Sequence, residues 1–261
     1  DALRKAMGKK KKAIVDQMKP KFIKQGQANG HDPQILEKIW SDWEKFASYA
    51  FNKSHATCYS WVAYQTAYLK AHYPAEYMAA LMTRRFSQIT EITKLMEECK
   101  AMKIATLGPD VNESQIGFGV NKHGEIRFGL SAIKGMGASA AESIVREREA
   151  NGPYKDIYDF AERIDLSNVN RKAFESLAYS GGFDSFGLQR EQYFGVTGKG
   201  DLFLDTIVRY GQLFQMEKAE QQNSLFGGMD AVAVIHPVAP KSEKWPTIEK
   251  LNKERELVGV Y

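Results

Sequence analysis

The stretch from Gly129 to Arg148 constrains the fold more than any other part of the sequence. It reads Gly-Leu-Ser-Ala-Ile-Lys-Gly-Met-Gly-Ala-Ser-Ala-Ala-Glu-Ser-Ile-Val-Arg-Glu-Arg. Apolar residues recur at helical spacing on both sides of a glycine pair, Gly135 and Gly137. We expect positive φ angles in this turn, because glycine adopts them without steric cost. The pattern predicts a short helix, a tight turn and a second helix.

A helix that begins after Gly137 leaves unpaired backbone N–H groups and a positive dipole end in the turn, which suits a phosphate. Lys134, Arg146 and Arg148 add positive charge nearby. The stretch resembles a helix-hairpin-helix, a motif that holds the DNA backbone without reading the base sequence. The candidate DNA-binding residues are Lys134, Gly135, Gly137, Ala138, Ser139 and Arg146.

A plain helical hairpin is the alternative interpretation of the same residues. Ser139 and Glu142 have the spacing of a capping box, in which side chains occupy the amides of the first helical turn. In that case the turn would have no amides left for a phosphate.

Composition places the chain among ordinary globular proteins, with 261 residues, 43% hydrophobic and 26% charged. The net charge is only +4, but residues 1–24 hold nine Lys and Arg against two Asp, a net charge of +7. A basic segment of this kind indicates a polyanionic partner rather than a membrane. No apolar run is long enough to span a bilayer. Two distant cysteines argue against a disulfide framework and favour the cytoplasm.

The rest of the chain reads as mainly helical with a small antiparallel β element. Helices are expected in residues 1–28, from Asp32-Pro33 onward, and over 56–72, 75–85 and 89–103. Three short strands are expected between residues 104 and 128. Two further helices precede Gly181-Gly182, where residues 181–187 indicate a second, less regular hairpin, so that the hairpins form a tandem. Beyond it we expect a helix over 201–220, a proline-containing linker over 231–247 and a last helix over 247–256.

The sequence contains no motif that is typical of a catalytic site. No Asp-x-Asp pair suits a two-metal site, and His55 with Cys58 lacks a second ligand pair for zinc. The chain opens on Asp1 within a charged helical pattern and stops in what reads as the start of a strand. We therefore expect a piece of a longer protein that has no catalytic residues and no metal ligands of its own.

Several stretches together resemble the alpha subunits of bacterial DNA polymerase III, the C-family replicative polymerases. They follow in the same order over most of residues 1–187 and again at 221–228. The stretches are Leu3-Arg-Lys-Ala-Met-Gly-Lys-Lys10, Phe51-Asn-Lys-Ser-His-Ala56, Val62-Ala-Tyr-Gln-Thr-Ala-Tyr-Leu-Lys-Ala-His-Tyr-Pro-Ala-Glu76, Pro109-Asp-Val-Asn-Glu-Ser114 and Ile126-Arg-Phe-Gly-Leu-Ser-Ala-Ile-Lys-Gly135.

The resemblance implies three regions. Residues 1–103 would be the C-terminal part of the polymerase fingers, and 104–187 would hold the β element and the tandem hairpins. Residues 188–261 would form a helical linker region that leads toward an oligonucleotide-binding fold. Arg4 and Lys5 match the basic positions beside the triphosphate of the incoming nucleotide, although Lys5 replaces the usual arginine.

The resemblance also implies the partners. They are primer–template DNA, a nucleoside triphosphate, the beta sliding clamp and other replicase subunits, with no membrane. Clamp binding would use a pentapeptide in which Gln222, Ser224, Leu225 and Phe226 match the bacterial pattern. Mg²⁺ would be bound in the full-length enzyme by residues outside this chain, so the chain alone is expected to be inactive as a polymerase. The alternative function is a standalone helix-hairpin-helix DNA-binding or adaptor protein.

Overall fold

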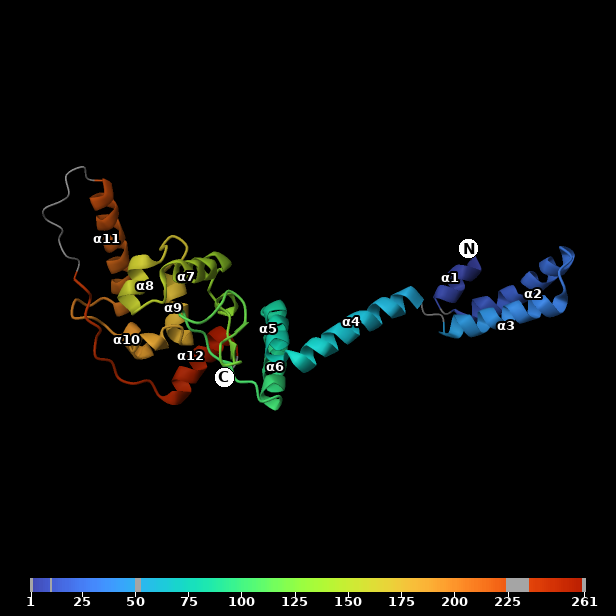
Figure 1. The fold of residues 1–261 in the computed structure, drawn as a ribbon, viewed down its shortest axis with the longest axis horizontal. Coiled ribbons are helices and arrows are strands. Elements are labelled where there is room, and N and C mark those ends of the chain that lie inside the picture. Colours follow the sequence, from blue (N-terminus) through green and yellow to red (C-terminus); the bar gives the residue numbers. More distant parts are fainter. Residues whose placement is uncertain (1, 10, 50–52, 224–234, 260–261) are drawn as a thin grey trace. The chain divides into compact units, whose positions relative to one another are not determined.

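The computed structural model describes residues 2–9, 11–49, 53–223 and 235–259. They form two compact units, Asp1–Tyr68 and Leu69–Tyr261 (Figure 1). The described part is mainly helical with one small sheet, which confirms the predicted fold class. Among the described residues, no helix is long and apolar enough to cross a membrane.

The first unit is built from α1 (Ala2–Gly8), α2 (Lys12–Ala28), α3 (Pro33–Tyr49) and the start of α4 (Lys53–His72). The predicted start of α3 is confirmed, because the Asp32 carboxylate accepts a hydrogen bond from the Gln34 amide at 2.8 Å. Trp40 is fully buried, and its ring lies 5.3 Å from that of Phe22. The tryptophans of α3 therefore form a small core rather than a ligand platform.

The second unit begins with α5 (Pro74–Arg85) and α6 (Ile89–Ala101), which pack against each other and beside the sheet. The remaining helices are α7 (Ala138–Asn151), α8 (Ile157–Arg163), α9 (Arg171–Ser180), α10 (Arg190–Tyr193), α11 (Phe203–Asn223) and α12 (Thr247–Val258). Single 3₁₀ turns, η1 (Leu130–Ala132) and η2 (Asp184–Phe186), precede α7 and α10. Helix α11 packs along α8 and α9, and α12 packs on α9 (Figure 1).

The sheet differs from the expected antiparallel arrangement. Its strands are β1 (Thr106–Leu107), β2 (Gly119–Val120) and β3 (Ile126–Arg127), in the order β1-β3-β2. The β2–β3 pair is antiparallel as predicted, but β1 runs parallel to β3. The reason is the long connection after β1, where Asp110 closes a turn by accepting a bond from the Asn112 amide at 2.7 Å. A parallel neighbour needs such a crossover, whereas a tight hairpin gives an antiparallel one.

Arg148 belongs to the core and not to the hairpin surface. Its guanidinium donates hydrogen bonds to the carbonyl oxygens of Val111 and Ser114, at 2.9 and 2.7 Å, and its side chain is buried. Burial lowers the pKa of the guanidinium from its ordinary value. The expectation that Arg148 adds positive charge near a phosphate was wrong. It ties α7 to the loop that follows β1, and loss of its bonds would cost about 1–3 kcal/mol for each carbonyl left unsatisfied.

Candidate functional site

The glycine hairpin is present, and the two glycines of its turn differ. Gly135 has φ +91°, as predicted. Gly137 has φ −78° and ψ 155°, so the expected positive φ there was wrong. Gly137 is the N-cap of α7, a position that requires extended backbone rather than the left-handed region. The first helix of the hairpin is also shorter than expected, since η1 is a single 3₁₀ turn.

The N-terminus of α7 is open to solvent. Gly137, Ala138 and Ser139 are exposed, and the N-cap Gly137 has no side chain with which to cap the helix. Ser139 is the second helical residue and not the N-cap, which rules out a capping box between Ser139 and Glu142. The first-turn amides therefore keep their hydrogen-bonding capacity, and the helix dipole adds about half a positive charge at this end.

Neighbouring helices fix the shape of the turn. The Lys134 amide donates to the Leu257 carbonyl at 2.9 Å, and the Ser176 hydroxyl donates to the Lys134 carbonyl at 3.0 Å. Met136 is buried under the turn. A Cβ atom at Gly135 would lie 2.8 Å from the Ser176 hydroxyl oxygen, so only glycine fits there. The side chain of Lys134 is exposed beside this rigid turn.

Arg146 lies further along α7, on a face that carries carboxylates. It is exposed and lines a cavity of about 360 Å³ together with Glu142, Glu147 and Asp165. Glu147 is already engaged by Arg163 at 3.0 Å. Ser139, at the open end of α7, lines the same cavity as Arg146, so Arg146 lies near that end but among carboxylates. Lys134, Gly135, Gly137, Ala138 and Ser139 lie together at the turn.

A second glycine turn repeats the geometry of the first. Gly187 has φ +80° and lies two residues before Gln189, the N-cap of α10, as Gly135 lies two residues before Gly137. The N-terminus of α10 is occupied, however. The Gln192 side chain accepts from the Gln189 amide at 2.9 Å, and Arg190 is paired with Asp184 at 2.6 Å and with Glu254 at 2.8 Å. The second turn is therefore a structural element of the unit.

The remaining predicted residues lie elsewhere. Arg4 and Lys5 are exposed on α1 of the first unit. Gln222 is in the last turn of α11, while Ser224, Leu225 and Phe226 lie outside the described residues. Where the described chain resumes, His236 stacks on Tyr158 with ring centroids 4.4 Å apart, and the Tyr158 hydroxyl donates to the Pro237 carbonyl at 2.5 Å. The expected linker after residue 231 thus lacks helices and strands over 235–246 but is attached to the folded unit.

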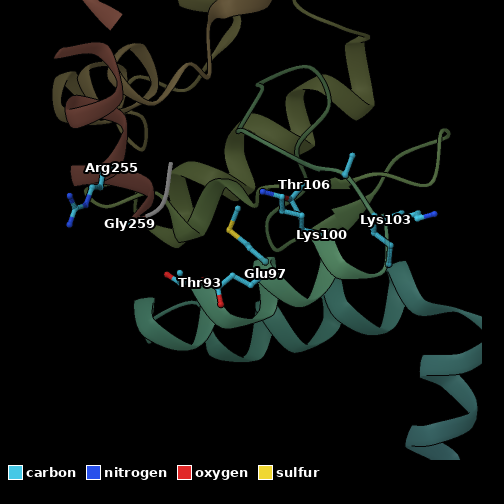
Figure 2. A pocket seen from close by; sticks show the side chains of 10 residues that line it. Thr93, Glu97, Lys100, Lys103, Thr106, Arg255 and Gly259 are labelled. Carbon is cyan, nitrogen blue, oxygen red and sulfur yellow. The ribbon is translucent and has the colours of Figure 1, made fainter. Parts of the chain in front are cut away.

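Sequence patterns did not predict the largest cavity that we describe, about 750 Å³, between α6, residues 103–106 and the end of α12. Figure 2 shows Thr93, Glu97 and Lys100 approaching it from α6, with Arg255 and Gly259 on the opposite side. Lys103 adopts a positive φ of 61° at its edge. Within the described ranges no group of three or more His, Cys, Asp or Glu side chains is placed to hold a metal ion. The cavity is lined by Lys100, Lys103 and Arg255 together with the carboxylate of Glu97.

Residues 103–193 match a protein family described as "Helix-hairpin-helix motif". The DNA polymerase III subunit alpha of Chlamydia trachomatis is 42% identical over 268 residues, covering 100% of this chain and 21% of that protein. The chain is homologous over its whole length to one segment of the DNA polymerase III alpha subunits.

Other alpha subunits agree with this result. The DNA polymerase III subunit alpha of Haemophilus influenzae is 38% identical over 266 residues, and that of Vibrio cholerae is 37% identical over 262 residues. Both alignments cover the whole of this chain. They cover only 22% of each relative, so this chain spans about one fifth of the relatives' length. The predicted resemblance to alpha subunits is confirmed.

Proposed function

We propose that this chain is the part of a DNA polymerase III alpha subunit that holds duplex DNA through the first glycine hairpin. The observation that carries the proposal is the open N-terminus of α7, where the residues after Gly137 are exposed and the N-cap, a glycine, has no side chain. The helix-hairpin-helix match over residues 103–193 supports it. The hairpin would bind one backbone phosphate, without reading base sequence.

Each residue of the turn has a physical role in this proposal. The Ala138 and Ser139 amides would donate to phosphate oxygens, and the exposed Lys134 side chain would supply positive charge. Gly135 keeps the turn closed on Ser176, so that the amides remain aimed outward. Arg146 would make at most a peripheral contact, because Glu142 and Asp165 line the same cavity.

Duplex binding by the 261-residue chain tests the proposal. Fluorescence anisotropy with short labelled duplexes of unrelated sequence is expected to give similar affinities, because phosphates carry no sequence information. Affinity is expected to fall with salt, with a log–log slope of about −0.9 for each phosphate neutralised. An affinity that does not change between about 50 and 200 mM salt would exclude phosphate contacts.

The full-length protein would be a DNA-directed DNA polymerase. In it, residues 1–103 would be fingers, 104–187 the β element with hairpins, and 188–261 the linker region with the clamp motif. Mg²⁺ would be held by carboxylates outside this chain. We place the protein in the cytoplasm, with primer–template DNA, a nucleoside triphosphate, the sliding clamp and other replicase subunits as partners.

Arg4 and Lys5 would face the triphosphate of the incoming nucleotide in that enzyme. Arg4→Ala in the full-length protein is expected to raise the KM for nucleotides about tenfold, the equivalent of one charged hydrogen bond of about 1.5 kcal/mol. Primer–template affinity should change less. Lys38→Ala, which removes an exposed lysine from α3 outside the basic segment, is the matched control. Equal nucleotide KM values for Arg4→Ala and Lys38→Ala would remove Arg4 from the nucleotide site.

A further inference from the structure

A third cavity lies against the glycine hairpin. It has a volume of about 310 Å³ and is enclosed by the hairpin turn, α9 and α12. Its lining includes one lysine from each of these three segments: Lys134, Lys172 and Lys253.

Lys172 lies along the turn itself. A Cβ atom built on Gly135 would approach the Cε atom of Lys172 to 3.3 Å. The hydrogen bonds from Lys134 to Leu257 and from Ser176 to Lys134 fix the turn to α12 and α9. The cavity and the hairpin are therefore one rigid surface within the second unit.

The positive charges of the cavity are incompletely neutralised. Within the described part of the chain, neither Lys134 nor Lys172 has an ion-pair partner. The Lys253 ammonium is held over the rings of Tyr179 and Trp245, at 4.8 Å from each centroid, which fixes its position.

Three carboxylates lie near these lysines: Glu175 and Glu256 in the cavity lining, and Glu249 beside Lys253. Glu249 forms an ion pair with Lys253, its carboxylate oxygen 3.7 Å from the ammonium. Of the two carboxylates that line the cavity, Glu175 is engaged by Arg171 at 2.5 Å. Glu256, the other, is exposed. The cavity thus presents more positive than negative charge to a ligand.

We propose that this lysine-lined cavity binds a second phosphate of the DNA strand whose neighbouring phosphate is held by the hairpin amides. The proposal rests on the hairpin binding DNA, as proposed above. It adds Lys172 and Lys253, from α9 and α12, to the DNA interface. Lys134 belongs both to the hairpin turn and to the lining of the cavity, so a strand with one phosphate at the turn would bring a neighbouring phosphate to the lysines of the cavity.

Charge substitutions on the cavity rim test the proposal in the 261-residue chain with a short labelled duplex. Lys172→Gln is expected to weaken binding about fivefold to tenfold near 0.1 M salt and to reduce the salt slope by about one. Lys172→Arg should keep the affinity, since the charge is retained. Glu256→Gln is expected to tighten binding, because it removes a negative charge facing the phosphate. Lys199→Gln is the matched control, since it removes an exposed lysine that lines none of the cavities described.

The outcomes separate this proposal from the function on which it rests. Equal affinities and salt slopes for Lys172→Gln and Lys199→Gln, in a chain that binds DNA and loses binding when the hairpin is altered, overturn the second phosphate site alone. A parent chain that does not bind duplex DNA contradicts the proposed function instead. Thermal unfolding of each variant shows that the fold is intact.

Discussion

Gly137→Asp is expected to abolish DNA binding by the hairpin while leaving the fold intact. Gly137 is the uncapped N-cap of α7, and its φ and ψ suit an aspartate. A Cβ atom there meets nothing closer than the Ser139 hydroxyl oxygen at 3.8 Å, so the new side chain fits. Its carboxylate would occupy the first-turn amides and place a negative charge where the phosphate would bind. Duplex affinity should fall at least tenfold, and stability should rise by a few tenths of a kcal/mol.

The matched control is Gln88→Asp, which adds the same charge at another exposed N-cap without a side-chain cap, that of α6. It should leave duplex affinity close to that of the parent chain. Gly137→Asn, which caps the helix without adding charge, is expected to give an intermediate affinity. Parental affinity in Gly137→Asp, measured by anisotropy on a folded variant, would show that the hairpin has only a structural role.

Most helices and turns were predicted from the sequence, because helix caps and glycine turns are determined by residues close together in the chain. The Asp32-Pro33 pair predicted the start of α3, and the glycines predicted the turn before α7 and the end of α9 at Gly181. Gly137 was misjudged because a glycine before a helix fits either a left-handed turn residue or an extended N-cap. The parallel β1–β3 pair was missed because short strands carry no signal of which neighbour they pair with.

The site itself was predictable only in part. Arg146 and Arg148 are two positions apart on one helix, so they point to nearly opposite faces. Which face is buried depends on the loop after β1, whose carbonyls bind Arg148. Lys172 and Lys253 lie far from the hairpin in sequence, and only the packing of α9 and α12 brings them to it. No spacing rule connects such residues, which is why the cavity was not anticipated.

Clamp binding gives the other large expected effect, and it concerns the predicted pentapeptide that begins at Gln222. In the proposed mode, Leu225 and Phe226 insert into an apolar pocket of the ring-shaped clamp while the Gln222 amide forms oriented hydrogen bonds. Burial of each apolar side chain contributes roughly 1.5–3 kcal/mol before the cost of ordering the peptide. We expect an affinity on the order of micromolar, about −8 kcal/mol. An affinity of this size suits a tether that keeps a polymerase on DNA while the clamp slides.

Leu225→Ala combined with Phe226→Ala is therefore expected to remove clamp binding. Losing both side chains costs at least about 3 kcal/mol, which weakens a micromolar complex more than a hundredfold. Calorimetric titration of the 261-residue chain with the sliding clamp of the same organism measures the effect. Met229→Ala truncates an apolar side chain just outside the pentapeptide and should bind like the parent chain. Undiminished binding by the double variant would place the clamp contact elsewhere, because no other part of the proposed mode supplies comparable apolar burial.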